Sequence, residues 1–319
     1  LSRNRGGLYG RLTCEIKLSP FTLKECEDYF KNENIEMSRY DIVQSYMVFG
    51  GIPYYLSYFK KGMSFEGNAD NILFGKNPRL KDEFNRLFNA IFSNPEDCKK
   101  IIRLLAKKHV GFTREEIAKE TGLPFGGGLT DTLNALVESD FIQRYRPYNV
   151  SGKVSFYKLI DNFSLFWLKY VEPNTEDINF MTDNMTSNIM RVWRGVAFEE
   201  VCWQHIGQIK RALGISGVSS SISAWSVKDN DNKEGVQIDL LIIRNDNVVN
   251  LCEMKFAGDI YSIDKEEDAK IRNRIQTLIN TLSPKQSVHL TMITTYGVSH
   301  TMYGGRVQQQ VILDDLFQS

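Results

Sequence analysis

Three residues near the end of the chain have the types and the spacing of a hydrolytic site. Asp239 lies inside the apolar run GVQIDLLII, while Glu253 and Lys255 belong to the next run, VVNLCEMKF. A carboxylate among buried strand residues is unfavourable unless it is paired or bound to a cation. Side chains two residues apart on a strand share one face, so Glu253 and Lys255 point the same way. The turn Asn245-Asp246-Asn247 brings their strand beside Asp239.

Two carboxylates that converge form the hard-oxygen site that Mg²⁺ or Mn²⁺ prefers. Such an ion lowers the pKa of a bound water and stabilises charge on a phosphoryl oxygen, while a lysine can hold or deprotonate the attacking water. Glu199, in the helical segment before these strands, is a third acid that can approach the same ion. The chemistry indicated is phosphodiester hydrolysis. The alternative is that Glu253 and Lys255 form a half-exposed surface ion pair with no chemical role.

The last third of the chain must position these residues. Its patterns predict one long helix, three short strands, a second helix and two final strands. The expected ranges are 187–213 and 264–282 for the helices, and 222–228, 236–243, 248–256, 287–295 and 308–313 for the strands. This mixed arrangement of helices and strands follows a polar boundary between 171 and 186.

A helical glutamate, an aspartate, thirteen intervening residues and E-x-K together resemble the PD-(D/E)xK nuclease superfamily over roughly residues 186–316. The core of that superfamily is a helix, an antiparallel run of strands, a helix and a final strand. The resemblance implies that Asp239, Glu253 and Glu199 bind Mg²⁺ or Mn²⁺, and that Lys255 acts with Asp239 and Glu253 in catalysis. Ile238 stands where the superfamily has the proline of its name. Many regulatory proteins carry degenerate versions of this fold, so a non-catalytic module is the alternative.

The middle of the chain has the element order of a winged helix. An amphipathic helix over 97–108 precedes a capping box, Thr113 to Glu116, which opens a short helix that ends at Gly122. A third helix is predicted over 129–139. Two strands follow, FIQRYRPY and VSFYKLI, with a turn at 149–152. Three helices followed by a hairpin are typical of a winged helix, a variant of the helix-turn-helix.

Positive charge is concentrated in this middle part. The whole chain has 39 basic and 39 acidic residues, which excludes a uniformly basic nucleic-acid coat. Residues 98–160, however, carry eleven lysines and arginines against six acids, a local charge of +5. These cations can contact phosphates without reading sequence. The third helix, which would enter the major groove, has no lysine or arginine. Two interpretations stay open: non-specific contact with nucleic acid, or a structural or protein-facing winged helix.

The first ninety residues predict helices and no strand. Thr22 and Glu25 have the spacing of a capping box, and a second helix is expected from Ser38. The segments LYGRLTCEIKLSPFTLKECEDYF and SYMVFGGIPYYLSYF resemble the helical lid of an archaeal and bacterial ATPase family related to AAA+ and STAND proteins. In that family a P-loop domain precedes the lid, a winged helix follows, and a PD-(D/E)xK-like domain often closes the chain.

This second resemblance covers nearly the whole chain and implies ligands for the lid. Gly51 and Pro53 match the G-x-P element of the related switch ATPases and would face bound nucleotide, and Arg11 would sense phosphate. No G-x-x-x-x-G-K-[ST] motif occurs in the sequence, which starts at Leu1 rather than at methionine. We therefore expect the carboxyl portion of an ATPase, which binds ATP only together with its upstream ATPase domain.

These observations predict an all-α lid over 1–90, a winged helix (α+β) over 91–171 and an α/β PD-(D/E)xK restriction-endonuclease-like domain over 172–319. The leading hypothesis is a metal-dependent phosphodiesterase that acts on nucleic acid. The alternative is a non-catalytic regulatory or protein-interaction module of a nucleotide-driven switch ATPase, with a protein partner. Five scattered cysteines without a CxxC pair indicate a reducing cytoplasm. No apolar run approaches the ~20 residues of a membrane span, so we expect a cytoplasmic protein without a membrane partner.

Overall fold

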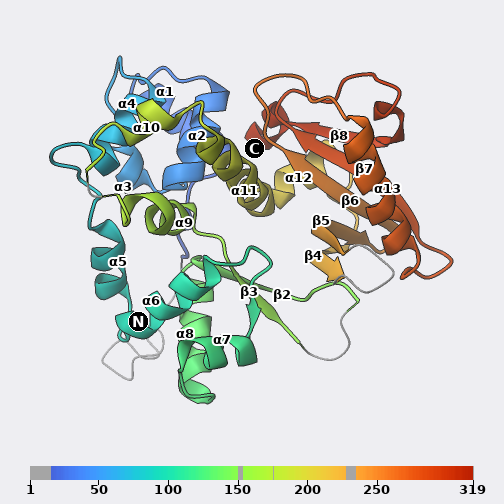
Figure 1. Ribbon diagram of the computed structural model, residues 1–319, viewed down its shortest axis with the longest axis horizontal. Helices are drawn as coiled ribbons and strands as arrows, with labels where there is room; N and C mark the ends of the chain where they lie inside the picture. Colours follow the sequence, from blue (N-terminus) through green and yellow to red (C-terminus); the bar gives the residue numbers. More distant parts are fainter. Residues whose placement is uncertain (1–15, 150–153, 175, 228–234, 319) are drawn as a thin grey trace.

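The computed structural model describes residues 16–149, 154–174, 176–227 and 235–318 and shows a multidomain α+β protein. Helices form the N-terminal part, a small three-stranded sheet lies in the middle, and a five-stranded mixed sheet follows (Figure 1). The predicted combination of helical and mixed-sheet parts is confirmed at this level. Among the helices within these ranges, none has the length and apolar character that a membrane span requires.

The N-terminal part is helical, as predicted. The hydroxyl of Thr22 accepts the backbone N–H of Glu25, and the Glu25 carboxylate accepts the backbone N–H of Thr22, which confirms the capping box. Ser38 caps the second helix in a similar way. The elements are α1 (Leu23–Asn32), α2 (Arg39–Phe49), α3 (Pro53–Leu56), α4 (Phe65–Ala69), the π-helical η1 (Asp70–Phe74) and α5 (Glu83–Ile91).

The middle part has three helices and a three-stranded antiparallel sheet. Its elements are α6 (Pro95–Leu105), β1 (Phe112–Thr113), α7 (Arg114–Thr121), α8 (Gly127–Glu138), β2 (Ile142–Tyr145) and β3 (Phe156–Leu159). The capping box at Thr113 is confirmed, and α7 ends at Gly122, whose φ of 72° suits glycine. The two-residue strand β1 was not predicted; it pairs with β3 and gives the order β1-β3-β2. Most of the predicted turn at 149–152 lies outside the described residues.

The C-terminal part contains all five predicted strands in a single sheet of order β4-β5-β6-β7-β8. β4, β5 and β6 are antiparallel, whereas β7 joins β6 in parallel because α13 carries the chain back between them, and β8 pairs with β7 in parallel. The elements are α11 (Asn188–Gln204), α12 (Ile206–Ala212), β4 (Ser220–Val227), β5 (Val236–Arg244), β6 (Val248–Lys255), α13 (Lys265–Ile279), β7 (Ser287–Thr294) and β8 (Gln309–Ile312).

The long helix predicted over 187–213 is broken at His205, so this prediction was wrong. The His205 backbone leaves helical geometry, with φ −108° and ψ 29°. Its buried ring donates from Nδ1 to the carbonyl of Val201 and accepts the backbone N–H of Leu23 at Nε2, 3.0 Å away. Burial lowers the pKa of His205 to about 4, so the ring is neutral. A partner at the start of α1, far away in sequence, therefore holds the ring at the point where α11 stops.

Two layers of helices cover the two faces of the large sheet. α11 packs on the face that presents Leu240 and Met254, and the same core continues into the N-terminal helices. α13 covers the other face, where Leu241 and Leu251 meet Ile271. Figure 1 shows α11 between the N-terminal helices and the sheet, with α13 on the far side.

After β3 the chain returns to the N-terminal helices before it enters the sheet. It does so through α9 (Asn162–Phe166), the π-helical η2 (Trp167–Val171) and α10 (Phe180–Asn184). The buried Asp70 carboxylate accepts the backbone N–H groups of Met181 and Thr182 at 2.7 and 3.0 Å and the Thr182 hydroxyl at 2.6 Å. Residues near 180, inside the stretch predicted to be a polar boundary, thus pack against the N-terminal part.

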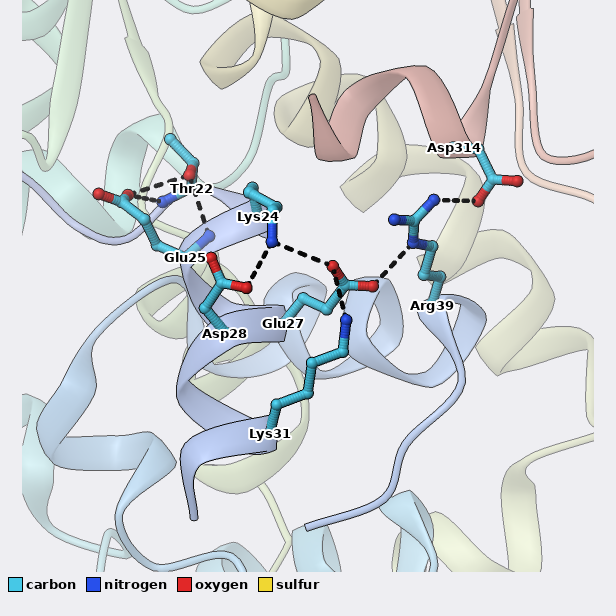
Figure 2. Close-up of polar contacts among 8 residues, drawn as sticks. All are labelled: Thr22, Lys24, Glu25, Glu27, Asp28, Lys31, Arg39 and Asp314. Atoms are coloured by element: carbon cyan, nitrogen blue, oxygen red, sulfur yellow. Dashed lines mark hydrogen bonds and ion pairs between the residues drawn. The ribbon is translucent and has the colours of Figure 1, made fainter. Parts of the chain in front are cut away.

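A charged network joins the N-terminal helices to the C-terminal end of the chain (Figure 2). The side chain of Glu27 is only 8% exposed and pairs with Arg39 at 2.8 Å, Lys31 at 3.2 Å and Lys24 at 3.5 Å. Arg39 also donates to Asp314 at 2.9 Å. Asp314 belongs to the 3₁₀-helix η4 (Leu313–Phe317), which follows β8; a further 3₁₀-helix, η3 (Gly304–Arg306), precedes that strand. Arg39 therefore bridges two distant parts of the chain.

Candidate functional site

The predicted acids and lysine lie where β5 and β6 separate. The antiparallel ladder between these strands ends at the pair Leu240 and Cys252. Asp239 lies just before that pair on β5, and Glu253 and Lys255 lie just after it on β6. The tight hairpin predicted between them is confirmed, but the candidate residues are beyond its last ladder pair. Their side chains therefore surround a point at which the sheet opens.

Glu253 and Lys255 both face α13, which confirms that they share one face of the strand. Arg274 donates from Nη1 to both carboxylate oxygens of Glu253 at 2.9 Å. Lys255 Nζ lies 2.7 Å from a carboxylate oxygen of Glu267. Burial raises the pKa of Glu253, although the charges of Arg274 and Lys255 oppose this. Sequence reasoning missed Arg274 and Glu267, yet their seven-residue spacing places them on one face of a helix.

Glu199 and Asp239 form the part of the cluster that is not neutralised. The Asp239 carboxylate accepts a hydrogen bond from Gln237 Nε2 at 2.5 Å, and in the described parts of the chain neither acid has an ion-pair partner. Burial raises the pKa of Glu199 to about 8, helped by the negative charges of Asp239 and Glu200. Lys255 acts in the opposite direction. Glu199 from α11 and Asp239 from β5 therefore act on each other electrostatically.

A buried ion pair next to this cluster was not predicted. Lys158 of β3 lies 2.9 Å from Glu200, and their side chains are 6% and 1% exposed. The Lys158 ammonium also lies 4.4 Å from the ring centroid of Trp203. The indole N–H of Trp203 donates to the backbone carbonyl of Asp239 at 3.0 Å. The middle sheet is thus connected through Glu200 and Trp203 to the strand that carries Asp239.

The donor set fits a divalent cation only in part. In the described ranges, no cluster of three or more histidine, cysteine, aspartate or glutamate side chains has the arrangement of a metal site. Asp239 and Glu199 offer carboxyl oxygens without an ion-pair partner in the described ranges, which suits a hard cation, and Glu199 would release its proton to bind one. Glu253 is held by Arg274, so it can join such an ion only after that ion pair opens.

The residues predicted to face nucleotide have separate environments. A Cβ atom on Gly51 would lie 2.0 Å from the carbonyl oxygen of Phe21, and the Phe21 N–H donates to the Gly51 carbonyl at 2.7 Å. Close approach of two backbones therefore explains this glycine without a ligand. Gly51 also lines a cavity of 420 Å³. Pro53 is exposed at the first position of α3. Arg11 lies outside the described residues.

The basic residues of the middle part are not all available at the surface. Lys99 and Lys158 are buried, and Lys99 pairs with Glu96 at 2.8 Å. Arg103 forms a two-point ion pair with Glu172. The charge of +5 in this part therefore overstates the positive charge that a nucleic acid would meet.

Comparison with known proteins shows similar chains, but these chains do not indicate an activity. No protein-family model matches the sequence. The uncharacterized protein MJECL04 of Methanocaldococcus jannaschii is 28% identical over 245 residues, which are 75% of this chain and 52% of that protein. The crystal structure of protein VC1899 from Vibrio cholerae matches 76% of this chain and 55% of that chain, with 14% identity and a TM-score of 0.28. This chain thus spans about half the length of the two proteins.

Proposed function

We propose that the C-terminal part is a PD-(D/E)xK nuclease-like domain with a metal-dependent phosphodiesterase centre for nucleic acid. The observation that carries the proposal is that Glu199, Asp239, Glu253 and Lys255 act on one another electrostatically at the opening between β5 and β6, where in the described ranges Glu199 and Asp239 have no ion-pair partner. The order of elements, a helix, three antiparallel strands, a helix and a parallel strand, supports it.

Each side chain has a role in this proposal. Asp239 and Glu199 would hold Mg²⁺ or Mn²⁺, and Glu253 would join them once Arg274 releases it. The bound ion would supply an activated water and stabilise charge on the phosphoryl oxygen. Lys255 lies beside the same acids and would orient the attacking water, while Glu267 holds its ammonium group in place.

The other parts complete the proposal. The three helices and hairpin of the middle part have the order of a winged helix, whose exposed basic residues would contact phosphates without sequence readout. The N-terminal helices would be the lid of an ATPase whose nucleotide-binding domain lies upstream. Since this chain carries no P-loop motif, ATP would bind only in that larger protein.

The test is cleavage of plasmid, single-stranded DNA and RNA with Mn²⁺ by the wild type, Asp239→Asn and Lys255→Met. We expect both variants to lose about 100-fold or more in rate, as is usual when a group that acts on the reacting atoms is removed. Glu266→Gln is the matched control, because that carboxylate on α13 is 79% exposed and pairs with Lys270. Equal cleavage by wild type and Asp239→Asn would exclude the proposed centre.

A second candidate function is a non-catalytic regulatory module. The ion pairs Arg274–Glu253 and Lys255–Glu267 favour it, because they occupy two of the four predicted site residues with partners from α13. On this hypothesis, calorimetric titration with Mn²⁺ gives no binding heat for the wild type or for Arg274→Met, which frees Glu253. Binding of Mn²⁺ that disappears in Asp239→Asn would decide for the nuclease.

A further inference from the structure

Aromatic side chains from distant parts of the chain meet next to the candidate site. Phe198 of α11 contacts Phe256, with 5.4 Å between their ring centroids. Phe256 stacks on Tyr40 of α2, with centroids 4.8 Å apart and an interplanar angle of 23°. Tyr40 and Tyr296, which follows β7, have nearly parallel rings at 10° with centroids 6.3 Å apart. Four segments of the chain, α2, α11 and the residues that follow β6 and β7, therefore build one aromatic group.

The rings of Tyr40 and Tyr296 do not cover each other. Carbon atoms in contact lie about 3.5 to 4 Å apart, so parallel rings at 6.3 Å are either separated by a gap or displaced sideways. In both cases aromatic surface is left uncovered. Both residues line a single cavity of 570 Å³, and Tyr296 is 46% exposed. A third planar ring between two others needs about 7 Å, more than the 6.3 Å between these centroids, so the more exposed Tyr296 must move outward to admit one.

Polar groups surround this aromatic surface. Arg39 and Asp314, which pair with each other (Figure 2), line the same cavity together with Thr295. They offer donors and acceptors to the edge of a base. Arg194 acts on Tyr40 electrostatically and donates to Gln44 and to the Met185 carbonyl. In the described ranges Arg194 has no carboxylate partner, so its charge is available for a phosphate.

We propose that Tyr40 and Tyr296 form a slot for an unpaired nucleobase, which makes single-stranded nucleic acid the substrate class of the adjacent centre. The slot is linked to that centre along the chain, since Phe256 follows Lys255 and Phe198 precedes Glu199, and both phenylalanines belong to the aromatic group. Bases in a duplex are stacked on their neighbours and reach such a slot only when they leave the helix. Stacking on aromatic side chains is the usual way in which proteins hold single strands.

The assignment of a substrate class rests on the proposed nuclease function, whereas the binding of a base between Tyr40 and Tyr296 does not. Binding of single-stranded nucleic acid is therefore measured separately from cleavage. The experiment is fluorescence anisotropy in EDTA, in the Asp239→Asn background, with a labelled 20-nucleotide dT strand. A duplex and an abasic strand of equal length serve as competing probes, and the abasic strand keeps the phosphates but lacks the bases. Adenosine monophosphate is added to test whether a free nucleotide fills the slot.

We expect Tyr296→Ala to weaken dT binding about 10-fold or more, as base stacking on one aromatic residue predicts. Tyr296→Phe should bind normally because it keeps the ring. Tyr54→Ala is the matched control, since Tyr54 is 56% exposed on α3, away from the cavity. The abasic strand should bind as weakly to wild type as the dT strand binds to Tyr296→Ala, and millimolar adenosine monophosphate should not displace the strand.

Several results would overturn the slot. These are no binding of dT by the protein, equal binding by Tyr296→Ala, equal binding of the abasic strand or the duplex, and displacement by micromolar adenosine monophosphate. Base-dependent binding without any Mn²⁺-dependent cleavage would support the base slot and contradict the proposed nuclease function. Cleavage that is insensitive to Tyr296→Ala would support the proposed nuclease function and contradict the base slot.

Discussion

Glu27 and Glu199 are the same residue type in opposite electrostatic environments. Glu27 accepts hydrogen bonds from Arg39 and Lys31 in the N-terminal network (Figure 2), and these cations lower its pKa to about 2. Burial beside Asp239 and Glu200 raises the pKa of Glu199 to about 8. A carboxylate that holds the fold together is neutralised by its neighbours. A carboxyl group that lies among other acids without an ion-pair partner, such as Glu199, remains able to bind a cation from solution.

Glu200 shows that burial alone does not make the difference. It follows Glu199 on α11 and is 1% exposed, but Lys158 neutralises it at 2.9 Å. Burial still raises the pKa of Glu200. Glu27 and Glu199 therefore differ in the cations that surround them. Substituting those cations, or the acids themselves, tests this difference.

The largest effect is expected from Lys158→Met, which leaves Glu200 buried without its cation. Removing one partner of a buried ion pair typically costs about 3 to 5 kcal/mol. We expect urea unfolding at pH 7 to show a loss of this size. The loss should shrink toward pH 5, because protonation of Glu200 then removes the uncompensated charge.

Lys100→Met is the control for this prediction, since that lysine is 57% exposed on α6 and lies 4.0 Å from Asp97. It should change stability little at either pH. A Lys158→Met protein as stable as the control would mean that water already reaches Glu200, and that the pair does not fasten the middle sheet to α11.

The second effect is expected from Glu27→Gln, which weakens the network of Figure 2. Hydrogen bonds to charged groups contribute about 1.5 to 3 kcal/mol, so we expect a loss of about 2 kcal/mol at pH 7. Because folding lowers the pKa of Glu27 from 4.5 to about 2, its stabilisation is complete above pH 4.5 and disappears as pH falls through 2. The difference between wild type and Glu27→Gln should therefore vanish at pH 2.

Asp28→Asn is the matched control on the same helix, because within the described ranges Asp28 pairs with Lys24 alone and is 51% exposed. Thermal unfolding at pH 7 should separate the two variants clearly. If Asp28→Asn destabilises the protein as much as Glu27→Gln, then Glu27 contributes no more to stability than an exposed surface carboxylate.

The smallest effect is expected from Glu199→Gln and has the opposite sign. Folding raises the pKa of Glu199 from 4.5 to about 8. The folded protein therefore holds this proton more tightly than the unfolded chain, and the free energy of unfolding falls as pH rises through this range. The variant should match wild type near pH 5 and exceed it by about 1 to 2 kcal/mol at pH 9, since one pKa unit corresponds to about 1.4 kcal/mol and partial solvent contact reduces the effect.

Mn²⁺ sharpens this prediction. An ion bound by Glu199 and Asp239 would stabilise both carboxylates, so it should stabilise wild type at pH 8 and leave Glu199→Gln almost unchanged. Stability curves with and without Mn²⁺ measure this directly. A Glu199→Gln protein that is less stable than wild type at pH 9 would show that the Glu199 carboxylate is paired with a cation.

Local patterns predicted most of the secondary structure because they act over a few residues. The capping boxes at Thr22 and Thr113 and the five strands of the large sheet all depend on neighbours in sequence. The break at His205 could not be found in this way, because the His205 ring is held there by a hydrogen bond from the backbone N–H of Leu23, which belongs to a distant helix. Strand β1 is only two residues long and exists because β3 pairs with it.

For the candidate site, the sequence by itself determined the residue types and which of them share a strand face. The alternation of side chains was enough to place Glu253 with Lys255. Only the tertiary structure decided which charges are neutralised, because Arg274, Glu267 and Lys158 come from other elements. Electrostatic energy depends on distance and burial rather than on position along the chain, and that is why Glu199 and Glu200, neighbours in sequence, have different partners.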